Sequence, residues 1–163
     1  MPQKEAVIGR KPTLQPGIMF QKLLVICTGN ICRSPMAEAM LSARLLESGQ
    51  FTVESAGIGA LVGAPADPLA VDLMNSRGLD ISGHRARQLT LELGREFDLI
   101  FVMERGHKQW VDGRIPELRG RVYTLGHWTE TVIPDPFRKP REHFEQALEL
   151  IDQGVNEWTR RLI

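Results

Sequence analysis

The 163-residue sequence contains only two cysteines, Cys27 and Cys32, and they lie close together in the chain. A disulfide between two cysteines so close in sequence cannot cross-link distant parts of the chain, which argues against a small secreted protein stabilised by disulfides. No run of eighteen apolar residues occurs, so no membrane insertion is predicted. Residues 1–18 include basic side chains but lack the apolar core of a signal peptide. We therefore expect a disordered N-terminal extension over 1–18 and a single domain over 19–163.

The chain also lacks a surplus of charge of either sign. Twenty basic and twenty acidic residues cancel, whereas proteins that bind nucleic acids generally carry a basic surplus. The four histidines are scattered, and their spacing does not correspond to that of metal ligands. The sequence thus predicts neither a nucleic-acid partner nor a metal site.

Short apolar runs alternate with segments of helical periodicity along most of the chain. Unbroken apolar runs predict buried strands at 23–26 and 99–102. The segments at 51–55, which enters a Gly-rich loop, and at 122–125 are also predicted to be strands. Helical spacing of apolar residues predicts helices that begin near 34, 67, 89 and 104, and a long amphipathic helix over 144–162. This alternation predicts an α/β protein in three layers, with a central four-stranded parallel sheet flanked by helices.

The loop after the first predicted strand carries the most informative motif. It reads Cys-Thr-Gly-Asn-Ile-Cys-Arg-Ser over residues 27–34, that is, C-x5-R-S, and Ser34-Pro35 reads as the N-cap and first position of a helix. The carboxyl end of a parallel strand followed by a helix N-terminus is a common place to bind an anion, because unpaired N–H groups face it there. Gly29 and Asn30 tolerate the left-handed backbone that would curl these groups inward.

A dianion such as a phosphate group would fit this loop. The expected phosphate-binding residues are those of the loop and its exit: Thr28, Gly29, Asn30, Ile31, Cys32, Arg33 and Ser34. Arg33 could bind two phosphate oxygens at once, and Cys27 would lie beneath the phosphorus atom as a nucleophile. Ser34 could donate a hydrogen bond to the sulfur. The loop is not a Walker A motif, because no Gly-Lys-Ser/Thr follows.

At these residues the chain resembles the low-molecular-weight protein tyrosine phosphatases. Besides the loop, the resemblance rests on Glu-Ser-Ala-Gly at 54–57, His-Arg-Ala-Arg-Gln at 84–88 and Asp-Pro-Phe at 135–137, and it extends over nearly the whole chain. The segments at 59–63, 126–128 and 134–139 are similar to those of the bacterial branch that acts with tyrosine autokinases in exopolysaccharide export. The resemblance implies a cytoplasmic enzyme that hydrolyses phosphotyrosine without a metal or organic cofactor.

Asp135 is the expected general acid, because loss of a tyrosine phenolate requires a proton from a nearby group. The residue lies between two prolines in a segment that cannot form regular structure. The resemblance implies the same role for it. Cys27, Arg33 and Asp135 are therefore the expected catalytic residues.

The remaining site residues follow mainly from the resemblance. Asn30, Ser34, Ser55 and His84 match positions that hold the loop in shape by hydrogen bonds. Cys32 matches a position that traps an oxidised nucleophile as a disulfide. The expected pocket walls are Ile31, Leu61 and Phe137, of which Phe137 would stack on the substrate ring.

Three other functions are compatible with a C-x5-R loop. Thiol-dependent arsenate reductases share C-x5-R but need further cysteines downstream, and none follows Cys32. A phosphoarginine phosphatase would be expected to carry Thr in place of Ile31. A phosphopeptide-binding module without turnover is disfavoured because Cys27 and Asp135 are both present. We expect a phosphotyrosine protein substrate, in particular a membrane tyrosine autokinase, and a monomer or weak oligomer.

Overall fold

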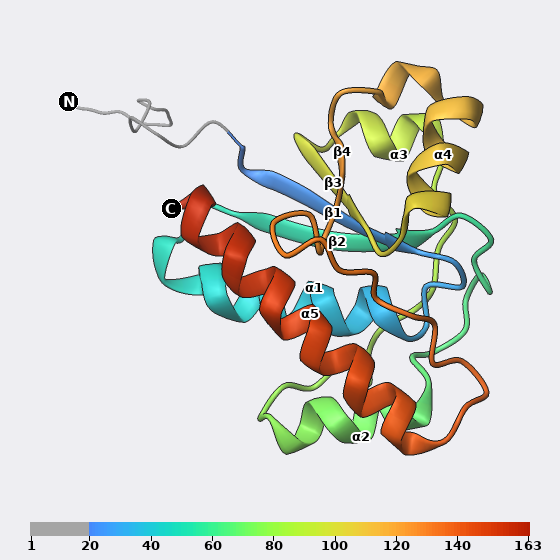
Figure 1. Cartoon of the computed structure of the whole chain (residues 1–163), viewed down its shortest axis with the longest axis vertical. Coiled ribbons are helices and arrows are strands. Elements are labelled where there is room, and N and C mark those ends of the chain that lie inside the picture. Colours follow the sequence, from blue (N-terminus) through green and yellow to red (C-terminus); the bar gives the residue numbers. More distant parts are fainter. Residues whose placement is uncertain (1–19) are drawn as a thin grey trace.

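A computed structural model describes residues 20–163 of the chain, and the extension expected over 1–18 lies outside these residues. The described part forms one parallel sheet between two layers of helices (Figure 1). The strands are β1 (Lys22–Cys27), β2 (Thr52–Gly57), β3 (Leu99–Val102) and β4 (Val122–Thr124), in the spatial order β2-β1-β3-β4. The predicted α/β class, the parallel sheet and its four strands are confirmed.

The two central strands, β1 and β3, are buried over almost their whole length because their side chains face a helical layer on both sides, as expected for continuous apolar runs. In β1, Leu23 and Val25 point into one core and Leu24 and Ile26 into the other, and all four are fully buried. The first core is covered by α1 (Arg33–Leu45), α2 (Pro68–Ser76) and α5 (Arg141–Leu162). The second is covered by α3 (Leu91–Arg95) and α4 (Arg105–Arg114) on the other face of the sheet (Figure 1).

Two short 3₁₀ helices complete the list of elements, Leu46–Ser48 (η1) and Pro116–Leu118 (η2). The amphipathic α5 runs diagonally across α1 and packs against it (Figure 1). The helix expected to begin at 89 begins at Leu91, because the side chain of Thr90 accepts a hydrogen bond from the N–H of Leu93 and caps the helix. No helix within residues 20–163 is long and apolar enough to cross a membrane.

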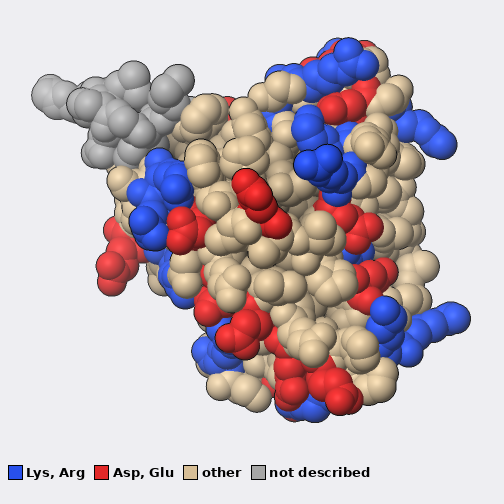
Figure 2. Space-filling view, viewed as in Figure 1, with Lys and Arg blue, Asp and Glu red and all other residues tan. Residues whose placement is uncertain are grey.

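Acidic and basic side chains are interspersed on the face that α5 covers, and no broad field of one sign occupies it (Figure 2). Much of this mixing comes from pairs within one helix turn, such as Arg161 with Glu157 at 2.9 Å. The balanced charge of the sequence is thus reproduced locally on this surface.

The order of the strands places the predicted anion-binding loop at the carboxyl end of a central strand. β1 lies between β2 and β3, and its last residue, Cys27, pairs in register with Gly57 at the end of β2. The segments that follow β1, β2 and β3 therefore meet at the same edge of the sheet, which is where ligands bind in open α/β sheets.

Candidate active site

Cys27 lies at the bottom of the loop that joins β1 to α1. The residue is 2% exposed, and its Sγ atom lies 2.9 Å from Oγ of Ser34. No backbone N–H of residues 28–33 donates a hydrogen bond to an acceptor within the described part of the chain. The six N–H groups between the Cys27 sulfur and the first turn of the 13-residue α1 are therefore available to a ligand, and the loop leads into the positive end of that helix. This arrangement suits an anion, since free N–H groups and the helix dipole both favour negative charge.

The helix begins two residues earlier than the sequence suggested. α1 starts at Arg33, its N-cap is Cys32, and no side chain caps it. The expectation that Ser34 is the N-cap is therefore wrong, and its hydroxyl is directed to Cys27 and Asn30 instead. The uncapped start leaves the first N–H groups of the helix available.

Asn30 organises the loop from its centre. Its backbone is left-handed, with φ of 62°, and its side chain is fully buried. The Nδ2 group donates to Oγ of Ser34 at 2.7 Å and to Oγ of Ser55 at 3.0 Å, while Oδ1 accepts from the N–H of Arg87 at 2.9 Å. Nε2 of His84 lies 2.6 Å from the carbonyl oxygen of Asn30. These contacts hold a non-glycine residue in a conformation that it would otherwise rarely adopt.

The same contacts set the direction of the hydrogen bond to the nucleophile. A backbone N–H can only donate, so Oδ1 of Asn30 is the acceptor and Nδ2 the donor. Ser55 donates its own hydrogen to Oε1 of Glu38 at 2.5 Å. Ser34 accepts from Asn30, which leaves the Ser34 hydrogen free to point at the sulfur of Cys27.

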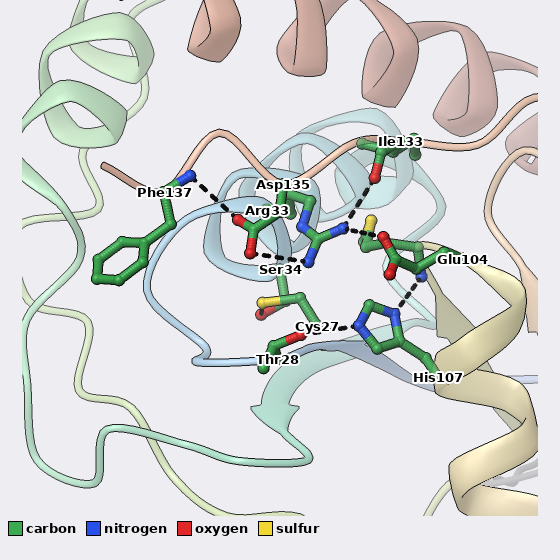
Figure 3. Close-up of polar contacts among 10 residues, drawn as sticks. Cys27, Thr28, Arg33, Ser34, Glu104, His107, Ile133, Asp135 and Phe137 are labelled. Atoms are coloured by element: carbon green, nitrogen blue, oxygen red, sulfur yellow. Dashed lines mark hydrogen bonds and ion pairs between the residues drawn. The ribbon is translucent and has the colours of Figure 1, made fainter. Parts of the chain in front are cut away.

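Arg33 is buried, with 2% of its side chain exposed, and its charge is compensated from two sides. Nη1 donates to a carboxylate oxygen of Glu104 at 2.9 Å and to the carbonyl of Ile133 at 2.8 Å (Figure 3). Nη2 lies 3.6 Å from Oδ2 of Asp135. Nε is buried and makes no hydrogen bond within residues 20–163. Nε and Nη2 thus form the free side of the guanidinium, the fork that matches two oxygens of a phosphate group.

A cavity of about 140 Å³ opens above this loop. Its floor is formed by loop residues that include Cys27, and Leu61 and Phe137 stand at its sides. Ile31 is nearly buried, whereas Leu61 and Phe137 are 47% and 37% exposed, so the upper walls reach the surface. The pocket is therefore polar at its base and apolar at its mouth, a form that suits a phosphate carried on an aromatic ring.

Asp135 lies at the rim of this cavity, across from Cys27 (Figure 3). Its side chain is 47% exposed, and Oδ1 accepts a hydrogen bond from the N–H of Phe137 at 3.1 Å. This short turn and the two flanking prolines restrict the carboxylate, while Oδ2 remains on the side of Arg33.

Cys32 is a free, buried thiol in the same loop. Burial raises the pKa of this thiol far above its usual value, and the negative charges of Asp67, Cys27 and Asp135 add to the effect. Cys32 is therefore protonated at neutral pH. Among residues 20–163, no group of three or more potential metal-ligating side chains occurs.

Two residues at this site, Glu104 and His107, are not indicated by any sequence motif. Glu104 binds Arg33, and His107 lies 3.0 Å from the hydroxyl of Thr28. Both follow β3, and the rule that ligands bind beyond the carboxyl ends of parallel strands could have marked them. All other side chains that the sequence singled out lie in or beside the loop, with Ser55 and His84 bonded to Asn30 and Leu61 and Phe137 at the pocket mouth.

Comparison with known proteins gives consistent matches. The family model described as low molecular weight phosphotyrosine protein phosphatase matches residues 22–163. The low-molecular-weight protein-tyrosine-phosphatase Wzb of Salmonella typhimurium is 46% identical over 88% of this chain and 95% of its own length. The protein named probable low molecular weight protein-tyrosine-phosphatase EpsP, of Ralstonia nicotianae, is 49% identical over 88% of this chain and 97% of its own length.

Solved structures agree with this result. The crystal structure of the tyrosine phosphatase Wzb from Escherichia coli K30 in complex with sulphate superposes with a TM-score of 0.84 at 40% identity, covering 89% of this chain and 100% of that one. These matches confirm the resemblance, including the bacterial exopolysaccharide-associated branch that the sequence indicated.

Proposed function

Because this chain belongs to the low-molecular-weight phosphotyrosine protein phosphatases, we propose that it hydrolyses phosphotyrosine in two steps through a phosphorylated Cys27. The observation that carries this proposal is that Cys27 and Arg33 line one pocket, in a loop whose six N–H groups have no acceptor within residues 20–163, as is also true of Nε of Arg33. A phosphate bound there would present its phosphorus to the sulfur, with its equatorial oxygens facing the donors.

In the first step, the Cys27 thiolate attacks phosphorus, an S–P bond forms and the bond from phosphorus to the tyrosine oxygen breaks. The departing phenolate takes a proton from Asp135. The charge on the three equatorial oxygens is stabilised by the N–H groups of residues 28–33 and by Nε and Nη2 of Arg33.

In the second step, Asp135, now a carboxylate, accepts a proton from a water molecule whose oxygen attacks phosphorus. The S–P bond breaks, inorganic phosphate leaves and the sulfur departs as a thiolate. The hydrogen of Ser34, which lies on the Cys27 side of its hydroxyl, stabilises that thiolate. Every proton and electron pair in this cycle is supplied by these residues, the substrate and water.

The pocket supports an aromatic phosphoester over a phosphoserine. Leu61 and Phe137 stand at the mouth and Cys27 at the floor, so the phosphate must reach past two apolar side chains. A tyrosine ring spans this depth and buries its faces against the walls, whereas a serine side chain is too short.

We also propose that the protein substrate is a membrane tyrosine autokinase, that the enzyme acts on it in the cytoplasm, and that it thereby regulates exopolysaccharide production. This part rests on the similarity to Wzb and EpsP. A substrate-trapping experiment tests it. Cys27→Ser protein should retain a tyrosine-phosphorylated kinase from a lysate of the source cells, and free phosphotyrosine should release it.

The chemical proposal has its own test. Purified wild type should release phosphate from a phosphotyrosine peptide and from p-nitrophenyl phosphate, and Cys27→Ser should release none from either. Acid quenching of a ³²P-labelled reaction should leave the label on protein, in a peptide that contains Cys27. A wild-type enzyme that turns over without ever carrying label would contradict the two-step route.

A further inference from the structure

His107, in the first turn of α4, is 2% exposed and makes two hydrogen bonds with its ring. Nδ1 lies 3.3 Å from the backbone nitrogen of Met103, and Nε2 lies 3.0 Å from Oγ1 of Thr28 (Figure 3). A backbone N–H can only donate, so Nδ1 is an acceptor and carries no hydrogen. In a neutral ring the single hydrogen is then on Nε2, and the ring donates it to Thr28.

The two partners of this ring belong to two parts of the site. Thr28 directly follows Cys27 and opens the anion loop. Met103 directly precedes Glu104, whose carboxylate holds Nη1 of Arg33 at 2.9 Å. His107 thus joins the turn after β3 to the start of the loop after β1, where Thr28 lies 79 positions before it in the sequence. Its ring does not line the pocket cavity.

The charge state of the ring agrees with this geometry. Burial lowers the pKa of His107 to about 4, and the nearby Arg33 acts in the same direction, while Glu104 and Asp135 oppose it. The ring is therefore neutral at neutral pH. A protonated ring would point an N–H at the N–H of Met103, and this contact would be lost.

We propose that His107 is a positioning residue, whose neutral ring fixes Thr28 and the Met103–Glu104 turn relative to each other and thereby aligns the anion loop with Arg33. The inference rests on the proposed phosphoryl transfer, because it concerns the geometry of that same site. His107 acts through Thr28 and Glu104 and exchanges no proton with the substrate.

Three substitutions separate the two contacts. His107→Asn places an amide oxygen near the position of Nδ1, so it can accept from Met103 but falls short of Thr28. His107→Gln extends an amide nitrogen toward the position of Nε2, so it can donate to Thr28 but offers Met103 no acceptor. His107→Leu makes neither contact. The exposed His143 on α5 provides the control, His143→Gln.

We expect kcat of the folded Leu variant to fall by about tenfold, with a smaller change in KM, and each amide variant to recover part of the loss. The affinity for vanadate, which reports the assembled loop without turnover, should follow the same order. Thr28→Val should match His107→Asn, and the double variant should be no worse than either alone. His143→Gln should behave as wild type.

Two readouts are independent of turnover. The ¹⁵N–¹H correlation spectrum of the ring should show hydrogen on Nε2 of His107 at pH 7, and far-UV circular dichroism should show that each variant is folded. The inference is overturned if the ring carries its hydrogen on Nδ1, or if folded His107→Leu retains kcat and vanadate affinity within twofold of wild type. If wild type shows no phosphatase activity, the proposed function fails, while the spectrum and vanadate affinity still decide the role of His107.

Discussion

Arg33 and Glu104 form an ion pair at 2.9 Å across 71 positions of sequence, and this pair decides which side of the guanidinium remains open. Glu104 and the carbonyl of Ile133 occupy Nη1, so Nε and Nη2 are the atoms left for a phosphate. The arginine is thus held in its working orientation before a ligand arrives. Preorganisation of this kind lowers the cost of binding and of the reaction.

Glu104→Ala should therefore reduce ligand binding and turnover without abolishing them. The glutamate is partly exposed, which limits the value of the ion pair, and we expect kcat/KM and vanadate affinity to fall by about tenfold. Steady-state kinetics and a vanadate titration measure this. The matched control is Glu149→Ala on the exposed side of α5. Equal behaviour of the two variants would show that Glu104 does not hold Arg33 in solution.

Asp135→Asn removes the acid but keeps the shape of the side chain. We expect kcat to fall by about 10²- to 10⁴-fold on phenyl phosphate and by much less on p-nitrophenyl phosphate, whose more acidic leaving group needs less help from a proton donor. Phosphate affinity should change little. The measurement is kcat on both substrates for both enzymes, and an equal loss on the two would argue against proton donation by Asp135.

Gly57→Ala should disturb the loop through its backbone. A Cβ at this last residue of β2 would overlap the carbonyl oxygen of Thr28, which cannot move independently of the loop. We expect a loss of about 1–3 kcal/mol in the free energy of unfolding, together with reduced turnover. Urea unfolding and kinetics measure the two effects. Gly83→Ala is the control, because a Cβ there would meet nothing within 4 Å.

Cys32 should decide whether oxidation is reversible. Peroxide converts the Cys27 thiolate to a sulfenic acid, and condensation with the Cys32 thiol would release water and form a disulfide. Without that thiol, excess peroxide oxidises the sulfenic acid further to a sulfinic acid, which dithiothreitol does not reduce. We expect dithiothreitol to restore activity to wild type but not to Cys32→Ala after such treatment. Mass spectrometry of the peroxide-treated wild type should show the disulfide. Full recovery of the alanine variant would show that Cys32 gives no such protection.

His107 should make the stability of the fold depend on pH. Its pKa is about 4 in the folded chain against about 6.5 when unfolded, so the unfolded state binds more protons between these values. The contribution to stability is complete above pH 6.5 and is lost as the pH falls toward 4, at no more than about 1.4 kcal/mol per pH unit. Urea unfolding of wild type and His107→Gln from pH 7 to 4 measures this. The variant should show the shallower dependence, and parallel curves would contradict the assignment.

The strands and the anion loop could be predicted because their signals are local. The unbroken apolar run that ends at Cys27 is short and is followed by Gly29 and Asn30, which favours a buried strand over a helix, and the motif after it is contiguous. Asn30 was identifiable because a left-handed backbone favours a few residue types. The alternation of strands and helices then sufficed for the fold class.

Glu104 and His107 could not be predicted in this way, since their importance arises only when β3 pairs with β1. In sequence, Glu104 and His107 resemble an ordinary polar helix start, and nothing marks the glutamate as the partner of Arg33 or the histidine as buried. The start of α1 was misplaced for a related reason. Ser-Pro favours a capped helix locally, but the hydroxyl of Ser34 is bonded to Asn30 and Cys27 in the folded chain.

The central place of β1 in the sheet couples the opening of this strand to unfolding of the whole domain. Both edges of this strand are paired, and its last five residues are buried, so no partial opening frees it while β2 and β3 stay in place. In native-state hydrogen exchange, the amides of β1 should belong to the slowest class, which exchanges only when the whole domain opens. Thermal inactivation should then coincide with global unfolding rather than precede it.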